Sequence, residues 1–478
     1  MRGSNWIAVS AFAISFVIRL IALEQTHFAN GWDAYFYLVQ VQSVFDTGAM
    51  HSEEWTLFYP LLLSVASIFD YILSIKILSA LLAASTTLAL ILIAKEHSKH
   101  YYLPLFIACW SLASPELTYF AAQWPKNLLG LTLLLYLILF LKKENYGLAI
   151  IFLILGLFGH RLTAILSIVY FAGWFAFDYL NLKLITVGLL SVSVLLTVLH
   201  FIPGVFSFHD LGRLSGLLNS TPIIPPIAFL KVFGQSKVDF SWQAELWILL
   251  FIIAIATALT IAAIIKGKIS KFPMLTIGVT LAFWLPVYNY ALDGAGYRFF
   301  HNGALLIPLL YCLLFDNLKL NKHSRKLILI LSSILLVASS FTWRSYDPTL
   351  HDPPYNLFKK ITEQVEDTWS AGKPELVIAH KALAEFFTYH TKVDAMPWLP
   401  EYKINRLYRM AHVPIPGMPE YYIPQGYVDL AGPYIYLEEL QWQRFVKSLK
   451  VNESDEVVAE FGTWKNPANA RPAYLLKN

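Results

Sequence analysis

A single carboxylate among aromatic side chains is the strongest chemical signal in the sequence. Asp33 lies in Gly31-Trp32-Asp33-Ala34-Tyr35-Phe36-Tyr37, shortly after the first apolar stretch. No Lys or Arg occurs from Leu20 to Ile75, so the sequence offers this charge no local ion-pair partner. A charge at a membrane is costly unless it is paired or used. Because partial desolvation raises a carboxylate pKa, such a group suits general-base catalysis on a hydroxyl, and we interpret Asp33 as a catalytic carboxylate.

Two simpler interpretations apply to this segment. Asp33 stands at the position of an N-cap for a helix expected over Ala34–Phe45, although capping does not exclude catalysis. Tyr35 and Tyr37 are candidates for sugar stacking, but tyrosines are also common in the aromatic belts of membrane proteins. The sequence leaves both alternatives open.

Three cations beside apolar stretches form a second set of candidates. Lys126 follows Gln123-Trp124-Pro125, Arg161 follows Gly159-His160, and Arg298 follows Gly296-Tyr297. Arg binds phosphate through a bidentate fork, whereas Lys acts as a point charge, so the three together suit an anionic lipid headgroup. The alternative is that each binds ordinary lipid phosphate or caps a helix C-terminus.

Other residues near these positions are weaker candidates for substrate binding. Glu116 is either a second acid or a partner of Lys126. His160 is a candidate for binding phosphate or sharing a proton, and a hydrogen-bonded structural role is equally compatible with it. Tyr297 adjoins Arg298, and Asp293 lies five residues before Arg298 in a turn-rich loop, where a structural pairing is the simpler interpretation.

The composition is that of a polytopic membrane protein. The 478 residues are 57% hydrophobic and 14% charged, with a mean hydropathy of +0.54, against about 45–50% apolar and about 25% charged in soluble proteins. The net charge of +4 is too small to indicate nucleic-acid binding. No zinc-type Cys/His spacing, Walker-type loop or GxGxxG pattern occurs, so no cofactor is indicated, although a divalent metal stays open.

The apolar stretches predict eleven membrane spans of about 20 residues. They lie at roughly 6–23, 72–94, 102–119, 127–141, 147–159, 163–180, 184–202, 246–265, 273–289, 300–316 and 326–343. The stretch Phe58–Phe69 is too short to cross and is expected to lie at the outer interface.

The basic residues predict the orientation of these spans. One set of connections carries thirteen Lys or Arg residues, and the opposite set carries six. Those six are Lys126, Arg161, Arg213, Lys231, Lys237 and Arg298. By the positive-inside rule, the N-terminus is cytoplasmic, and the Asp33 loop and the C-terminal tail are outside. We therefore expect an integral protein of the plasma or cytoplasmic membrane.

A change in composition after Trp343 divides the chain into a transmembrane domain, residues 1–343, and an extracytoplasmic domain, residues 344–478. The second part has no run of membrane length, and its helical and strand patterns predict an α/β or α+β domain. We expect a helix over 356–369, a strand over 375–379, a helix over 381–389 and loop over 410–436.

The order of several short motifs resembles that of the GT-C superfamily of polyprenyl-phosphate-sugar-dependent glycosyltransferases, which includes protein O-mannosyltransferases and lipid A aminoarabinose transferases. The early Asp33 is followed by Tyr35, then by Tyr59-Pro60-Leu61, Ser114-Pro115 and a late Tyr297-Arg298 before a span that contains Pro308. The resemblance covers roughly residues 1–343. The chain departs from it at Lys126-Asn127, where many relatives carry a second acid, and it lacks the Trp-Trp-Asp motif of oligosaccharyltransferases.

The resemblance implies a helical GT-C membrane fold and an inverting transfer of sugar from undecaprenyl or dolichyl phosphate at the outer face. It implies that Asp33 activates the acceptor and that Arg298, helped by Arg161 and Lys126, binds the donor phosphate. The expected partners are a polyprenyl-phosphate-linked sugar, membrane lipid and an acceptor glycan, lipid or protein, with no nucleic acid.

Three other functions stay open at this point. A lipid-linked glycan polymerase or ligase uses similar donors. A transporter or flippase is expected to carry ionisable groups at mid-membrane and repeat-related broken helices. The predicted spans are almost free of charge at mid-depth, and an odd number of spans with a large outer domain fits inverted repeats poorly. A non-catalytic assembly factor would use its outer domain to recruit partners.

Overall fold

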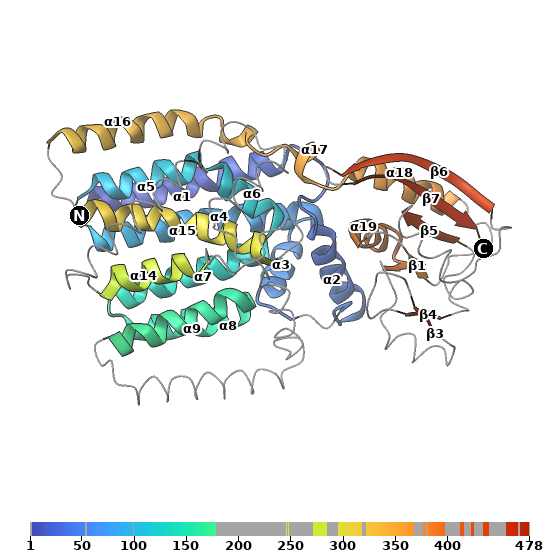
Figure 1. The fold of residues 1–478 in the computed structure, drawn as a ribbon, viewed down its shortest axis with the longest axis horizontal. Helices are drawn as coiled ribbons and strands as arrows, with labels where there is room; N and C mark the ends of the chain where they lie inside the picture. The colour runs from blue at the N-terminus through green and yellow to red at the C-terminus, as the bar shows by residue number, and fades with distance from the viewer. Residues whose placement is uncertain are drawn as a thin grey trace. The chain divides into compact units, whose positions relative to one another are not determined.

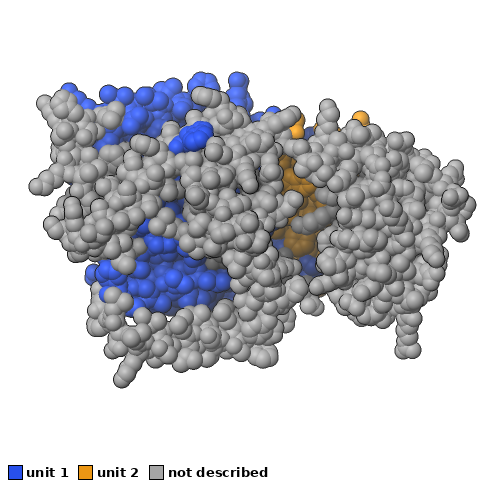
Figure 2. Space-filling model, in the orientation of Figure 1, with its two compact units in different colours: residues 1–30, 52–348 blue, residues 31–51, 349–478 orange. Residues whose placement is uncertain are grey.

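The chain folds into two compact units, seen in a computed structural model. The structure describes residues 2–52, 55–98, 100–177, 245, 247, 271–283, 295–317, 322–367, 376–378 and 381–396, and five strands between 412 and 477. Unit 1 comprises residues 1–30 and 52–348, and unit 2 comprises residues 31–51 and 349–478. Figure 2 shows unit 1 in blue and unit 2 in orange. The segment around Asp33 thus belongs to the same unit as the C-terminal part of the chain.

Unit 1 is built from helices that run side by side (Figure 1). They are α1 (Arg2–Leu23), α3 (Phe58–Ala66), α4 (Tyr71–His97), α5 (Tyr102–Ala113), α6 (Pro115–Gln123), α7 (Pro125–Lys142), α8 (Tyr146–Gly159), α9 (Arg161–Ala176), α14 (Lys271–Ala282), α15 (Ala295–Asn317), α16 (Lys322–Ser339) and the short 3₁₀ helix η2 (Thr342–Arg344). Helix α4 packs against α1, α5 and α7, while α7 packs against α8 and α9.

Apolar helices of membrane length confirm an integral membrane protein. Within the described residues, three helices can cross a membrane by length and composition: Asn5–Leu23, Tyr71–His97 and Pro125–Lys142. The bent pair α5 and α6 passes the same test of length and composition when its two helices are taken together, as a broken span or a re-entrant loop. The predicted spans 184–202 and 246–265 lie almost wholly outside the described residues. The number eleven therefore stays a prediction.

The predicted span 102–119 is bent, because the helix breaks at Ser114. Helices α5 and α6 are inclined by 55° to each other. Pro115 has no backbone N–H and starts α6, and the Ser114 hydroxyl caps that helix by accepting from Leu117 N at 3.1 Å. The carbonyls at the end of α5 then need other donors. Arg19 of α1, fully buried, supplies them, with contacts of 2.6–3.0 Å to the carbonyl oxygens of Ser111, Leu112 and Ser114.

The predicted interfacial segment 58–69 is a helix only as far as Ala66. Asp70 follows it in an extended conformation and caps α4, accepting from Leu73 N at 2.9 Å. The carboxylate therefore separates α3 from the membrane-length helix α4.

Unit 2 contains both helices and strands. The helices are α2 (Ala34–Thr47), α18 (Tyr355–Asp367) and α19 (Lys381–Thr391), with the short α17 (Pro348–His351) at the boundary between the units. The strands are β1 (Leu376–Ile378), β2 (Asp394–Met396), β3 (His412–Pro414), β4 (Tyr422–Pro424), β5 (Tyr434–Glu438), β6 (Glu456–Asn466) and β7 (Asn469–Lys477). Helix α19 packs against α2, α18 and β2.

The strands form three small sheets. Strand β1 pairs with β2 in parallel, with Val377 opposite Ala395. Strands β3 and β4 are antiparallel, and β7 lies between β5 and β6 with both pairs antiparallel. Helices α18 and α19 and strand β1 agree with the elements predicted near them. The prediction of loop over 410–436 is wrong in part, because β3 and β4 pair within it as a hairpin. The Pro/Gly/Tyr-rich composition did not reveal this pairing.

Candidate functional site

The three predicted phosphate-binding cations all lie at the N-terminal ends of helices in unit 1. Lys126 is in the first turn of α7, Arg161 begins α9, and Arg298 is in the first turn of α15. None of these first turns contains an acidic residue. Lys126 and Arg161 also follow closely the C-terminal ends of α6 and α8, so the alternative that they cap a helix C-terminus stays open.

The surroundings of the three cations differ. Lys126 is buried, with 8% of its surface exposed, and its ammonium lies 5.8 Å from the ring centre of Tyr59 on α3. Arg161 is half-buried and Arg298 is exposed. The site thus ranges from a desolvated amine to a guanidinium that is open to solvent.

His160 lies between α8 and α9, where the positive charges of all three cations act on its imidazole. Burial lowers the pKa of its imidazole well below the ordinary value, and the positive charges of Lys126, Arg298 and Arg161 lower it further. Its Nδ1 atom is buried and has no hydrogen-bond partner among the residues that the structure describes. His160 is therefore neutral at neutral pH, and a negative charge placed among the three cations would favour its protonation.

Close backbone packing fixes the turn that carries His160 and Arg161. A methyl group at Gly130 of α7 would lie only 2.7 Å from His160 Cβ and would also meet Thr163. A methyl group at Gly159 would lie 3.4 Å from Gly130 Cα. Two glycines thus allow α7 to approach the turn between α8 and α9 one helical turn beyond Lys126, which holds Lys126 and Arg161 in neighbouring positions.

The electrostatics of this arrangement favour an anion. The N-terminus of a helix carries a partial positive charge and free N–H groups, so it attracts anions and disfavours cations. Three cations at such termini add to the helix dipoles instead of compensating them. The arrangement is suited to a multiply charged anion such as a phosphate or diphosphate.

A second polar group joins α6 and α15. The fully buried Glu116 carboxylate contacts His301 Nδ1, and Glu245 accepts a hydrogen bond from Glu116 N at 2.9 Å. His301 also packs against Trp124, with ring centres 5.1 Å apart. Glu116, expected as a second acid or as a partner of Lys126, thus interacts with His301 and Glu245.

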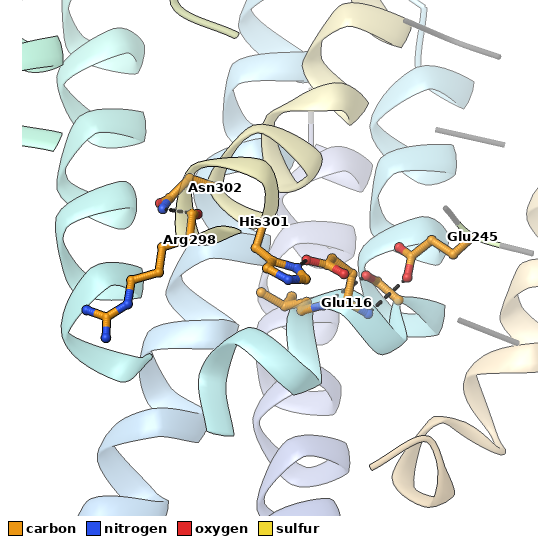
Figure 3. A network of polar contacts seen from close by, with 7 residues as sticks. Glu116, Glu245, Arg298, His301 and Asn302 are labelled. Carbon is orange, nitrogen blue, oxygen red and sulfur yellow. Dashed lines mark hydrogen bonds and ion pairs between the residues drawn. The ribbon is translucent and has the colours of Figure 1, made fainter. Parts of the chain in front are cut away.

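Arg298 and His301 are one turn apart on α15, but their side chains lie in different surroundings. Figure 3 shows their side chains leaving the helix in different directions, with His301 turned toward Glu116. Asn302 donates from Nδ2 to the carbonyl oxygen of Arg298 at 2.8 Å. The first two turns of α15 therefore carry an outward cation on one side. On the other side they carry the buried imidazole of His301, which pairs with Glu116 of α6.

Asp33, in unit 2, occupies the N-cap position of α2 without making the cap. Its φ and ψ are −99° and 3°, and its side chain forms no cap hydrogen bond. The capping alternative thus describes its position but not its hydrogen bonding. Gly31, two residues before it, has φ = 93°, a conformation that other residues adopt only with strain.

The tyrosines that follow Asp33 pack inside unit 2. Tyr35 is 1% exposed and Tyr37 is 5% exposed. The Tyr35 ring meets Tyr355, Phe386 and Tyr389 edge-on, with centres 4.8–5.2 Å apart. A ring that stacks on sugar needs an open face, so the structure favours a packing role over the expected sugar stacking.

The structure describes one of the two remaining candidates. Tyr297 is in the first turn of α15, and Asp293 lies outside the described residues. Among the described residues, no group of three or more His, Cys, Asp or Glu is placed to hold a metal ion.

Sequence reasoning overlooked Arg19, Glu245 and His301. A lone Arg inside the first apolar span was a usable signal, because such charges are rare in spans and are usually paired. His301 follows Arg298 by three residues and therefore lies near it on the helix. No signal links Glu245 to Glu116, since 129 residues separate them.

Comparisons with known proteins support the fold. No protein-family model matches the chain, and no curated protein matches it in sequence. A solved structure, the crystal structure of ArnT from Cupriavidus metallidurans bound to undecaprenyl phosphate, superimposes with a TM-score of 0.60. The chain shares the fold of ArnT. The match covers 99% of this chain and 98% of ArnT at 13% sequence identity. The resemblance to GT-C glycosyltransferases that the motifs indicated is therefore confirmed for the fold.

Proposed function

We propose that the protein is an inverting glycosyltransferase that moves a sugar from a polyprenyl phosphate, undecaprenyl or dolichyl, to an acceptor at the outer face of the membrane. Residues 344–478 then form an extracytoplasmic α/β or α+β domain. The acceptor is a glycan, a lipid or a protein.

The convergence of Lys126, Arg161 and Arg298 around His160 is the observation that carries this proposal. These residues are far apart in sequence, come from three helix N-termini, and act together on one imidazole. Their combined charge matches the phosphate of a lipid-linked sugar. The ArnT structure, whose fold the chain shares, is bound to undecaprenyl phosphate.

In the proposed reaction, Asp33 accepts the proton of an acceptor hydroxyl as that oxygen attacks the anomeric carbon of the donor sugar. The bond between the anomeric carbon and the phosphate oxygen breaks, and the polyprenyl phosphate leaves with the electron pair. A single displacement inverts the anomeric centre. Lys126, Arg161 and Arg298 stabilise the charge that develops on the leaving phosphate.

The other candidates take supporting roles in this proposal. His160 lies among the cations and would gain a proton when phosphate binds. Glu116 orients His301 from within the protein, and Tyr297 adjoins the cation Arg298. Asp293 stays a proposed contact of the substrate. The packing of Tyr35 and Tyr37 favours a structural role for both.

Bound lipid provides the first test. We would extract the lipids that copurify with the wild type, Arg298→Ala, Lys126→Ala and Lys142→Ala, and identify them by mass spectrometry. Lys142 is a matched control because it stands at the other end of α7 and also lies over an aromatic ring, 5.1 Å from the centre of Phe272. We expect polyprenyl phosphate, with or without sugar, in the wild type and in Lys142→Ala, and its loss from the other two variants.

Activity is the second test. Asp33→Asn keeps the size of the side chain and removes its basicity, so the outer glycans should disappear while lipid binding persists. Unchanged glycans in both Asp33→Asn and Arg298→Ala, in cells without the native copy, would overturn the proposal. Transport of substrate into vesicles without a covalent product would instead identify a flippase.

A further inference from the structure

The segment that carries Asp33 is held by the C-terminal part of the chain. Within unit 2, residues 351–355 contact both residues that precede Asp33. The Asp352 carboxylate accepts a hydrogen bond from Gly31 N at 2.7 Å, and the Tyr355 hydroxyl donates to Gly31 O at 2.6 Å. The Trp32 indole donates to His351 O at 3.1 Å. Both polar backbone groups of Gly31 thus have partners on this segment.

The residues in these contacts are constrained in conformation. Pro353 and Pro354 lie between Asp352 and Tyr355, and each has a fixed φ, so the two hydrogen-bonding side chains are held at a defined separation. Tyr355 is 4% exposed. Burial raises the pKa of its hydroxyl well above the ordinary value, and nearby Asp352 raises it further. The hydroxyl therefore stays protonated and remains a donor.

Packing continues the attachment along α2. Tyr35, two residues after Asp33, inserts among aromatic rings of α18 and α19, with its centre 4.9 Å from that of Tyr355. Farther along α2, Asp46 forms an ion pair with Lys392 at 2.7 Å. Helix α2, which follows Asp33, is thus held near both ends by the C-terminal part of the chain.

We propose that Asp352 and Tyr355 are positioning residues, which fix the Gly31–Asp33 turn and so set the direction of the Asp33 carboxylate. The C-terminal part of the chain then completes the catalytic apparatus. This inference rests on the proposed function for the role of Asp33, although the attachment itself can be measured independently of activity.

The test uses the full-length protein in detergent and four variants. Tyr355→Phe removes one hydrogen bond and keeps the ring. Asp352→Ala removes the acceptor for Gly31 N, whereas Asp352→Asn keeps an acceptor oxygen at the same place. Tyr389→Phe is the matched control, because it removes a hydroxyl from the same aromatic cluster, where its ring lies 5.2 Å from Tyr35.

Amide hydrogen exchange of the peptide covering residues 29–37 is the direct measurement. We expect faster exchange in Tyr355→Phe and Asp352→Ala, and wild-type exchange in Tyr389→Phe and Asp352→Asn. Turnover should fall about 10- to 100-fold in the first two variants, since small displacements of a catalytic group have effects of that size. Copurified polyprenyl phosphate should stay unchanged in all four.

The outcomes separate this inference from the proposed function. Unchanged exchange in Tyr355→Phe and Asp352→Ala, or equal behaviour of Asp352→Asn and Asp352→Ala, would overturn the positioning role. If exchange accelerates as expected but Asp33→Asn retains full activity, the attachment stands and the catalytic role of Asp33 falls. If Asp352→Ala does not fold, the comparison of Tyr355→Phe with Tyr389→Phe decides.

Discussion

Replacing Gly130 with alanine should displace the turn that carries His160 and Arg161. The added methyl group would lie 2.1 Å from Thr163 Oγ1 and 2.7 Å from His160 Cβ, whereas ordinary contact starts at 3.4 Å. Even if the Thr163 hydroxyl rotates away, the turn must retreat by about 0.7 Å to relieve the contact with His160. The overpacking should lower the free energy of unfolding by about 1–3 kcal/mol. Neither neighbour can move away from the methyl group at little energetic cost, because His160 Cβ is attached to the backbone and Thr163 has a short, branched side chain.

The effect on ligand binding follows from the same displacement. Moving a charge from about 4 Å to about 4.7 Å from a phosphate, at an effective dielectric of about 20, costs about 0.6 kcal/mol. Losing one charged hydrogen bond as well costs about 1.5–3 kcal/mol. The Kd for undecaprenyl phosphate should therefore rise by about 3-fold for the displacement alone, and by up to about 400-fold if the hydrogen bond is also lost.

Native mass spectrometry of the detergent-solubilised protein with added undecaprenyl phosphate measures this Kd, and thermal unfolding measures the stability. Gly278→Ala is the matched control, because a methyl group there meets nothing within 4 Å. It should bind lipid like the wild type and be more stable by about 0.5–1 kcal/mol, as expected for Gly→Ala within a helix. Wild-type binding and stability in Gly130→Ala would refute the reasoning.

Three further predictions concern stability, measured as Tm in detergent. Arg19→Met leaves three buried carbonyls at the end of α5 without their donor, so the protein should lose about 3 kcal/mol or more, and an unchanged Tm would contradict this. Burial and the charge of Lys359 lower the pKa of His390 from 6.5 to about 4. The unfolded state then binds more protons between those values, so stability falls as pH drops from 6.5 toward 4, and His390→Gln should flatten this dependence; parallel profiles would exclude it. Lys392→Ala breaks an ion pair whose side chains are 61% and 42% exposed, and should cost less than about 1 kcal/mol; a larger loss would show that the pair is desolvated in solution.

Local patterns in the sequence predicted much of the fold. The apolar stretches that became α1, α4 and α7 have the length and composition of membrane spans, and their periodicity needs no partner to be recognised. The break at Ser114-Pro115 was also visible in the sequence, but apolar composition continues across it. Hydropathy alone therefore extended one helix over a bend that proline chemistry could have predicted.

The choice of the cations as candidates had a different basis. In the predicted orientation, Lys126, Arg161 and Arg298 depart from the positive-inside distribution, and this marked them without any knowledge of the fold. Their gathering around His160 depends on the contact between α7 and the turn at His160, and single glycines such as Gly130 do not reveal which surface they meet. The contacts of Asp352 and Tyr355 with Gly31 span more than 300 residues, and no local pattern predicts such pairs.

The three cations also imply a link between stability and ligand. A cation at the N-terminus of a helix is disfavoured by about 0.3–1 kcal/mol, because it adds to the positive end of the helix dipole. A bound anion interacts favourably with both the cation and the dipole. A ligand that binds only the folded state raises the free energy of unfolding by RT ln(1 + [L]/Kd). Phosphate-bearing lipid should therefore stabilise unit 1, and Lys126→Ala should weaken that stabilisation.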